Sequence, residues 1–587
     1  MRYDFARFLN TRNAYGPSFT ADGRGITFVS DITGVPQLWS VPAVGGWPDQ
    51  LTFAADRVTA GHAMHHDNTL VFGMDTGGNE REQLYLLRGG DVLDLTPDPG
   101  VMHNFGAISP DDRRLAYTDN RRHPAYFDVY ARDLDGASER CVLQQEGSNF
   151  VADWSPNGDT LLLSRLTGSL DNQLFLLDIS SGDVAHLTPH EGLAVYQAAQ
   201  FAPDGAVYLL SDQDSEYRRL ARFPSGSPDL EWMTADVGDV DALRVSPDGR
   251  SVALVHNENG YGRLVIRDVA GSQEREAPGL PRGVITELMW SPDGDTLTFT
   301  FTSPADNMNV WTWHLEGDTC RQITWASRGG IPRNTFAVPE LVRYQSFDGL
   351  EISGFLYMPE VERPPVVVHV HGGPEARAQP LFSPVIQYFV HRGYAVLAPN
   401  VRGSTGYGRT FTHLDDVEKR MDSVADLKAA ADWLRACGCV GDRIAVMGGS
   451  YGGFMVLAAL TAYPDEWAAG VDIVGIANFE SFLRNTGAYR RAWRIPEYGD
   501  PEKDAGLLRS ISPINHVDRI RAPLMVIHGD NDPRVPLSEA EQIVQALVAR
   551  GQPVEFLHVA DEGHGIIKLA NKLQAYPAVG SFLDRFL

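Results

Sequence analysis

A short phrase that recurs seven times constrains the first half of the chain more than any other feature. In its full form it is an aromatic or apolar residue, then Ser or Ala, Pro, Asp or Asn, and Gly, with an apolar run after it. The acidic or amide residue of each copy is Asp22, Asp67, Asp111, Asn157, Asp204, Asp248 or Asp293. Successive copies lie 44 to 47 residues apart. A fixed period of this size indicates a repeat architecture.

Each repeat has the chemistry of a tight hairpin followed by further strands. Pro presets φ for a turn, and Asp-Gly or Asn-Gly supplies the positive φ that a two-residue hairpin needs. Alternating strands follow, such as Ile26–Ser30, and a third strand carries an aromatic residue, as in Gln37–Val41. Four short strands in a unit of this length make one blade of a β-propeller. The sequence therefore predicts a seven-bladed β-propeller over residues 17–330, with an unclosed β-solenoid as the alternative.

Charge and cysteine content exclude several classes of protein. The formal net charge is −26, and an acidic surface repels phosphate backbones and anionic lipids, so we expect no nucleic acid and no membrane as partner. The first ten residues lack the apolar run of a secretory signal. The four cysteines make no disulfide framework, and Cys437-Gly-Cys439 lacks a second cluster that would complete a zinc site. A cytoplasmic protein with no metal and no cofactor is expected.

The hydrophobic pattern changes after residue 331, where strands begin to alternate with longer helical stretches. The apolar run Pro365–Val370 is typical of a strand that is buried on both faces. Asp422–Cys437 has the apolar spacing of an amphipathic helix, and Arg443–Met447 is a strand that runs into glycines. This alternation predicts an α/β domain with a mostly parallel, doubly wound sheet over residues 331–587.

The sequence Gly448-Gly-Ser-Tyr-Gly-Gly453 places Ser450 between a predicted strand and a predicted helix. It fits the Gly-x-Ser-x-Gly pattern, in which a sharp turn strains the serine backbone and raises its hydroxyl above the sheet. A phosphate-binding loop would need Lys and then Ser or Thr after the last glycine, where this chain has Phe454 and Met455. Ser450 is therefore the predicted nucleophile.

An acid and a histidine follow Ser450 in the order that an α/β-hydrolase requires. Asp532 lies in the loop after a predicted strand, where a carboxylate can orient a histidine, and Asp530 in the same loop is the second candidate. His564 lies in a glycine-flanked loop after the next strand and is the predicted general base. His558, within that strand, is expected to be structural.

Two backbone N–H groups are needed to stabilise an oxyanion. One is expected from Tyr451, the residue directly after the nucleophile. The other is expected from Gly373, in the loop His371–Pro374 that follows the first long strand of the domain.

Five phrases, in this order, resemble the prolyl oligopeptidase family of serine peptidases. They are His371–Pro374, Asn400–Gly408, Gly448–Gly453, His528–Pro536 and Glu562–His564. The first and third together are most similar to the acylaminoacyl-peptidase branch. The resemblance implies a seven-bladed propeller that covers an α/β-hydrolase domain and excludes folded proteins. It also implies hydrolysis of short peptides, as an exopeptidase, through an acyl-enzyme.

The resemblance extends to substrate contacts. Arg534 matches an arginine, two residues past the catalytic acid, that binds a substrate carbonyl in relatives. Phe479, Phe482 and nearby Tyr489 or Trp493 are the expected side chains of the S1 pocket, with core packing as the alternative. The dipeptidyl-peptidase branch holds a free amino terminus with paired glutamates, and Glu80-Arg-Glu82 differs from that spacing, which disfavours this branch without excluding it.

Several alternatives stay open. The chain could be a dipeptidyl peptidase or oligopeptidase of the same family, an esterase or small-amide hydrolase, or a non-enzymatic propeller module with an inactive hydrolase domain. In relatives, a short segment such as residues 1–16 can brace the hydrolase domain. The sequence leaves open the end that is cleaved, the preferred side chain and a homo-oligomeric state.

Overall fold

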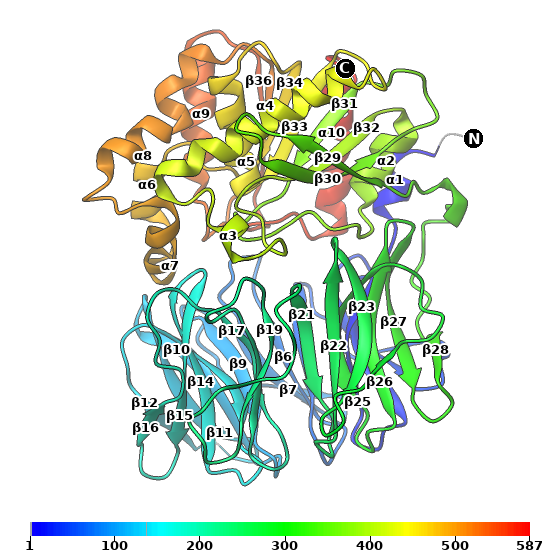
Figure 1. Ribbon diagram of the computed structural model, residues 1–587, viewed down its shortest axis with the longest axis vertical. Helices are drawn as coiled ribbons and strands as arrows, with labels where there is room; N and C mark the ends of the chain where they lie inside the picture. Colours follow the sequence, from blue (N-terminus) through cyan, green and yellow to red (C-terminus); the bar gives the residue numbers. More distant parts are fainter. Residues whose placement is uncertain (1–2, 137) are drawn as a thin grey trace.

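The computed structural model describes residues 3–136 and 138–587 and consists of two stacked domains (Figure 1). The lower domain in that view is built of strands, and the upper domain has helices around a central sheet. The last strand of the lower domain, β28 (Thr319–Gln322), is followed by β29 (Glu340–Gln345) of the upper domain. No helix among residues 3–136 and 138–587 is long and apolar enough to span a membrane.

The lower domain contains five antiparallel sheets, each of four consecutive strands. The first two are β1 (Ala14–Phe19), β2 (Gly25–Ser30), β3 (Gln37–Pro42), β4 (Asp49–Gln50), and β5 (Val58–Ala63), β6 (Leu70–Met74), β7 (Gln83–Arg88), β8 (Asp91–Asp94). The others are β17 (Tyr196–Phe201), β18 (Val207–Ser211), β19 (Arg219–Phe223), β20 (Glu231–Trp232), then β21 (Val240–Val245), β22 (Ser251–Glu258), β23 (Tyr261–Asp268), β24 (Glu274–Glu276), and β25 (Val284–Trp290), β26 (Thr296–Ser303), β27 (Asp306–His314), β28. The first strand begins at Ala14, inside the segment 1–16 that was expected to precede the propeller.

A sixth sheet in this domain has eight strands. They are β9 (His103–Ile108), β10 (Arg114–His123), β11 (Tyr126–Asp133), β12 (Glu139–Leu143), β13 (Ser148–Trp154), β14 (Thr160–Gly168), β15 (Asp171–Asp178) and β16 (Val184–His186). Its two halves are joined by one parallel residue pair, Phe127 with Ser148. The sheets thus have the propeller arrangement, while the number of seven blades stays a prediction.

The recurring turn explains why each repeat folds in the same way. In the last copy, the Ser291 hydroxyl donates to Asp293 at 2.6 Å and accepts from the Thr296 N–H at 2.9 Å. Gly294 completes the turn at a φ of 76°, which a residue with a side chain rarely adopts. Apolar residues after each turn then pack against the neighbouring sheet, and fully buried Trp313 is the largest of them. The local sequence therefore determines each hairpin, and the core forms between hairpins.

The upper domain is built around one eight-stranded sheet in the order β29-β30-β32-β31-β33-β34-β35-β36. Its further strands are β30 (Glu351–Tyr357), β31 (Val366–Val370), β32 (Ala395–Asn400), β33 (Ile444–Gly449), β34 (Ala469–Ile473), β35 (Leu524–Gly529) and β36 (Val554–Val559). From β32 to β36 every pair is parallel, while β29 and β30 join antiparallel. The mostly parallel sheet of an α/β-hydrolase is therefore present.

Helices cover both faces of this sheet. They are α1 (Phe5–Leu9), α2 (Pro384–Arg392), α3 (Arg409–Thr412), α4 (Arg420–Ala436), α5 (Tyr451–Ala462), α6 (Phe479–Asn485), α7 (Ala488–Tyr498), α8 (Ala505–Ile511), α9 (Leu537–Ala549) and α10 (Leu569–Leu583). Val366 and Val368 of β31 lie in the core beneath α4, α5 and α9, whereas Val367 lies in the core beneath α1, α2 and α10. Alternate residues thus enter opposite cores, which explains the continuous apolar run in the sequence.

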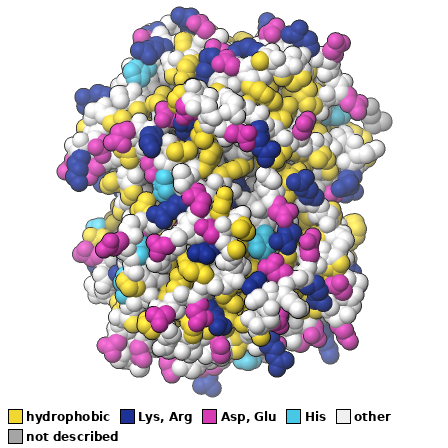
Figure 2. Space-filling view, in the orientation of Figure 1, with side chains coloured by type: hydrophobic (Ala, Val, Ile, Leu, Met, Phe, Trp, Pro, Cys, Tyr) yellow, Lys and Arg dark blue, Asp and Glu magenta, His cyan; other side chains and the backbone are white. Residues whose placement is uncertain are grey.

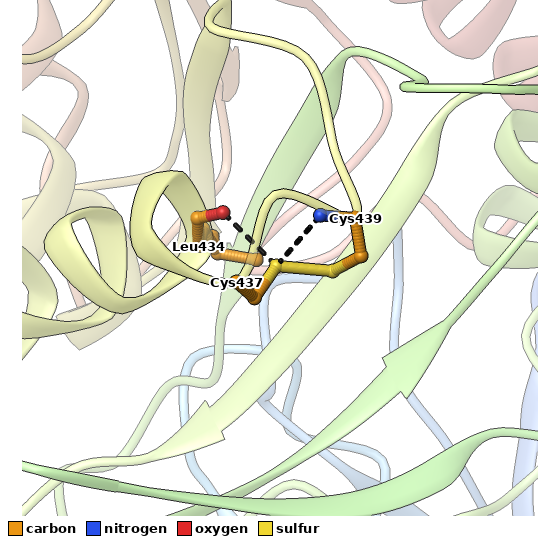
Figure 3. Close-up of a disulfide and its surroundings, with 3 residues drawn as sticks. All are labelled: Leu434, Cys437 and Cys439. Carbon is orange, nitrogen blue, oxygen red and sulfur yellow. Dashed lines mark hydrogen bonds between the residues drawn. A yellow bond between two sulfur atoms is a disulfide. The ribbon is translucent and has the colours of Figure 1, made fainter.

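Two features at the edges of the domain complete the fold. Helix α1 packs on α2 and α10, with the Phe5 ring stacked on Tyr388 at 3.8 Å between centroids. A disulfide joins Cys437 and Cys439 just after α4 (Figure 3). It closes a loop of only three residues, so its effect on the entropy of the unfolded chain is small.

Candidate active site

Ser450 lies at a sharp turn between β33 and α5. Its φ is 59° and its ψ −119°, and its N–H donates to the Ile473 carbonyl at 2.8 Å. A non-glycine residue at positive φ costs on the order of 1–3 kcal/mol, so the surrounding contacts must hold it there. A Cβ at Gly448 or Gly452 would lie 2.4 Å from a backbone oxygen. Glycine at both positions therefore lets the chain turn closely around the serine.

Asp532 and His564 reach this serine from the loops after β35 and β36, two neighbouring strands. His564 Nε2 lies 2.9 Å from Ser450 Oγ, and His564 Nδ1 lies 2.6 Å from Asp532 Oδ2. The other carboxylate oxygen, Oδ1, accepts from the N–H groups of Arg534 and Val535 at 2.8 and 3.0 Å. The structure thus brings together the three side chains of the predicted triad, in the geometry that proton transfer from the serine requires.

The other acid and histidine candidates lie around this arrangement without entering it. Asp530 pairs with His558 Nδ1 at 3.1 Å. His528 is buried, contacts the Val535 carbonyl at 2.8 Å and lies 3.7 Å from Asp532. Burial lowers the pKa of His528, so this ring packs beside the acid as a neutral group.

The two predicted oxyanion donors flank the nucleophile. Tyr451 is the first residue of α5, directly after Ser450. A Cβ on Gly372 would lie 3.3 Å from the Ser450 Cβ, so the loop that carries Gly373 runs beside the serine. Gly373 has a φ of 133°. This conformation suits glycine, and the role of its N–H as an oxyanion donor stays a prediction.

A polar cavity of about 280 Å³ opens between the two domains near this site. It is lined from the propeller by Arg57, Thr59, Asp75, Glu80, Glu82, Met102, Asn104, Phe127 and Phe150, and from the hydrolase domain by Tyr489, Arg490, Trp493 and Arg534. Arg534 Nε donates to Glu80 Oε1 at 2.6 Å, across the domain boundary. A larger, mainly apolar cavity of about 750 Å³ lies between the first two propeller sheets, and neither cavity is lined by a triad residue.

Phe479 and Phe482 line neither of these two cavities, contrary to the S1 expectation. Both rings are buried, with exposed fractions of 0% and 3%. They pack against Phe454 and Tyr498 in the core under α5. The apolar residues of α6 have helical spacing because one face of this helix is buried. The sequence alone cannot tell whether such a face packs in the core or lines a pocket. Tyr489 and Trp493, the other two aromatic residues considered for this pocket, both border the interdomain cavity.

Glu82 and Asp75 were not recognised from the sequence as site residues. Glu80 and Glu82 both line the cavity, and they sit one residue apart just before β7. Glu80 has a φ of 57°, so the chain is not extended there, and no period-two pattern in the sequence indicates that both carboxylates share one cavity.

Within the described part of the chain, one group of carboxylates could hold a cation: Asp415, Asp416 and Glu497, whose ligand atoms lie within 4.8 Å of one another. The guanidinium of Arg420 contacts both Asp415 and Glu497. The protein thus supplies the positive charge itself.

Asp472 of β34 lies beneath the nucleophile turn, fully buried against Gly453 and Gly475. Burial raises the pKa of Asp472 to about 7.

The unfolded chain releases this proton near pH 4, so the stability from the protonated native form is lost as pH rises from about 4 to about 7. At pH 8 we expect the free energy of unfolding of Asp472→Asn to exceed that of the wild type by at most about 4 kcal/mol. At pH 4 the two proteins should have nearly equal free energies of unfolding. Melting temperatures of both proteins across this range test it; a difference that does not change with pH would contradict it.

The fold and the site define the class of the protein: it is a serine hydrolase whose catalytic α/β domain is covered by a propeller. The model of the prolyl oligopeptidase family, Peptidase_S9, matches residues 380–587. Dipeptidyl peptidase family member 6 of Caenorhabditis elegans is 39% identical over 515 residues, which cover 80% of this chain and 69% of that protein. The chain therefore belongs to the prolyl oligopeptidase family and is a serine peptidase.

Two further proteins are similar over nearly the whole chain. Dipeptidyl aminopeptidase BIII of Pseudoxanthomonas mexicana is 28% identical over 598 residues, covering 95% of this chain and 84% of that protein. The solved structure of a puromycin hydrolase has a TM-score of 0.88 at 20% identity and covers 98% of this chain and 95% of that one. At 20% identity, this structural similarity shows a shared fold alone.

Proposed function

We propose that this peptidase removes short amino-terminal units, dipeptides in the first place, from oligopeptides with a free α-amino group. The acidic corner of the interdomain cavity, formed by Asp75, Glu80 and Glu82, carries this proposal. The acylaminoacyl-peptidase type that the sequence favoured is the alternative. The two differ in one chemical feature, the charge on the amino end of the substrate.

The acidic corner suits an ammonium group. Asp75 pairs with Arg57, and Glu80 pairs with Arg534, so both of these carboxylates face a protein cation. Glu82 is held instead by the hydroxyl of Thr59. Its carboxylate is largely buried, and burial raises its pKa. A substrate ammonium would supply a cation where burial makes an unpaired charge costly, whereas an N-acyl group would not.

Ser450 is the proposed nucleophile of the reaction. Its Oγ forms a bond to the scissile carbonyl carbon while its proton passes to His564 Nε2, and Asp532 stabilises the resulting imidazolium. The N–H groups of Tyr451 and Gly373 stabilise the oxyanion. The C–N bond then breaks, and the leaving amine takes the proton from His564. Water, deprotonated by His564, releases the acyl group and restores the serine.

The names of several relatives support the amino-terminal reading. Two of the relatives that match most of this chain are named as a dipeptidyl aminopeptidase and a dipeptidyl peptidase. The acylamino-acid-releasing enzyme of Sus scrofa matches over only 46% of this chain. We further propose that the covering domain is a seven-bladed propeller, which would confine access to short peptides.

A matched pair of chromogenic dipeptide substrates, one free and one N-acetylated, tests the proposal. We expect kcat/KM to be at least about 10-fold higher for the free peptide. Glu82→Gln removes the charge while it keeps the shape, so it should raise KM for the free peptide about 10- to 100-fold and leave the acetylated peptide unchanged.

The control is Glu139→Gln, a propeller glutamate that pairs with Arg121 outside the cavity and should leave both rates unchanged. Faster turnover of the acetylated peptide by the wild-type enzyme would reject this proposal in favour of an acylaminoacyl peptidase.

A further inference from the structure

Helix α7 connects the interdomain cavity to both sides of the proposed oxyanion hole. Tyr489, Arg490 and Trp493 line the cavity. The same helix carries Arg494 and Glu497, which turn into the hydrolase domain and form two ion pairs there. The first pair leads to Tyr451, and the second leads to the loop of Gly373.

The first pair centres on Arg420, at the start of α4. Its guanidinium is fully buried and contacts the side chains of Asp415 and Glu497. It also donates to the Tyr451 hydroxyl at 3.0 Å and to the Glu497 carbonyl at 2.8 Å. The Tyr451 hydroxyl in turn donates to Asp415 at 2.8 Å and lies 2.8 Å from the Ser423 hydroxyl. Three polar groups thus hold the hydroxyl of Tyr451, the residue whose backbone N–H is a proposed oxyanion donor.

The second pair joins Arg494 to Glu375, two residues after Gly373. Arg494 Nη1 lies 2.9 and 3.1 Å from the two carboxylate oxygens of Glu375. Their side chains are only 14% and 9% exposed. The loop that carries the second oxyanion donor is therefore tied to the same helix as the first.

Helix α7 is also held by the propeller. Trp493 Nε1 donates to the Ser148 hydroxyl at 3.1 Å, and the Ser169 hydroxyl donates to the Trp493 carbonyl at 3.1 Å. Figure 1 shows the lower end of α7 reaching toward the propeller strands. The helix thus touches the cavity, the covering domain and both donor segments.

We infer that Arg420 and Arg494 are positioning residues that couple helix α7 to the two oxyanion donors, Tyr451 and Gly373. This inference rests on the proposed acyl-enzyme chemistry of Ser450. A donor that moves by a fraction of an ångström loses its hydrogen bond to the developing negative charge, whereas ground-state binding changes little. Loss of the contacts that Arg420 or Arg494 makes should therefore lower kcat while KM is nearly unchanged.

The mildest test is Tyr451→Phe, which keeps the ring and the backbone N–H but removes the hydroxyl that Arg420, Asp415 and Ser423 hold. Arg494→Met removes the ion pair with Glu375. We expect each variant to lower kcat about 10-fold or more, with KM within about 3-fold of the wild type. The inhibition constant of a peptide aldehyde, which mimics the oxyanion, should rise by the same factor as kcat/KM falls.

Rates are divided by the concentration of active sites, which is measured by titration with a fluorophosphonate. Unfolded protein therefore does not contribute to the measured kcat. The control is Arg402→Met, because Arg402 is also buried and pairs with Asp348 and Asp426, away from α7. It should lower the melting temperature and leave kcat per titrated site unchanged. Tyr451→Phe and Arg494→Met with kcat and aldehyde affinity within about 2-fold of the wild type would overturn the inference. Activity that persists in Ser450→Ala would instead reject the proposed chemistry.

Discussion

Replacement of Ser450 by alanine is expected to lower kcat on a dipeptide chromogenic substrate by about 10⁵- to 10⁶-fold. The variant lacks the only hydroxyl that lies 2.9 Å from His564 Nε2 among the hydrogen bonds of the described residues. Alanine keeps the Cβ, so the strain of the turn at φ 59° is the same in both proteins. The melting temperature should therefore change little, and the loss of activity would come from the missing nucleophile and not from unfolding.

Labelling by a fluorophosphonate, followed by intact mass, gives a second readout for this variant. The wild type should gain one adduct and Ser450→Ala none. Ser510→Ala is the matched control, because the Ser510 hydroxyl is exposed and donates to a carbonyl of its own helix. Wild-type turnover by Ser450→Ala, or an adduct on another serine, would show that the nucleophile was assigned wrongly.

Replacement of Asp532 by asparagine is expected to lower kcat about 10⁴-fold, the second largest effect. Asp532 Oδ1 accepts two backbone N–H groups, so the amide oxygen of asparagine would occupy that side and its NH₂ would face His564. The ring would then accept at Nδ1 and carry its proton on Nε2, facing Ser450. In that tautomer His564 cannot take the proton of the serine, although all three side chains keep their places.

Asp530→Asn is the control for this variant, because Asp530 lies in the same loop and pairs with His558. It should change kcat by less than about 3-fold. A larger loss in Asp530→Asn than in Asp532→Asn would mean that the two acids were assigned the wrong way round. A pH profile of kcat in each variant provides an independent check.

Local sequence was sufficient to predict the elements and their class. The Ser-Pro-Asp-Gly turns specify hairpins through a hydrogen bond between neighbouring side chains and a glycine at positive φ, and both features depend only on consecutive residues. Continuous apolar runs such as Val366–Val370 predict strands that are buried on both faces, as the two cores of the sheet show. Figure 2 shows acidic and basic side chains interspersed over both domains on the face in view.

Contacts across the domain boundary could not be read from the sequence. Glu80 and Arg534 are separated by 454 residues and meet at 2.6 Å, so no local pattern reports them. Phe479 and Phe482 have the spacing of a helix face, and only the packing around them distinguishes a core from a pocket. The ties from α7 to Tyr451 and to the loop of Gly373 are equally non-local.

By itself, the sequence determined the repeat of β-hairpins, the alternation of strands and helices, and the order of a serine, an acid and a histidine in loops after parallel strands. These features are short-range, because turn chemistry and hydrophobic period act over a few residues. The tertiary structure decided which acid faces His564, which aromatic rings border the cavity, and that carboxylates of the propeller lie near the catalytic site. Those outcomes depend on how two domains pack, and packing joins residues that lie hundreds of positions apart.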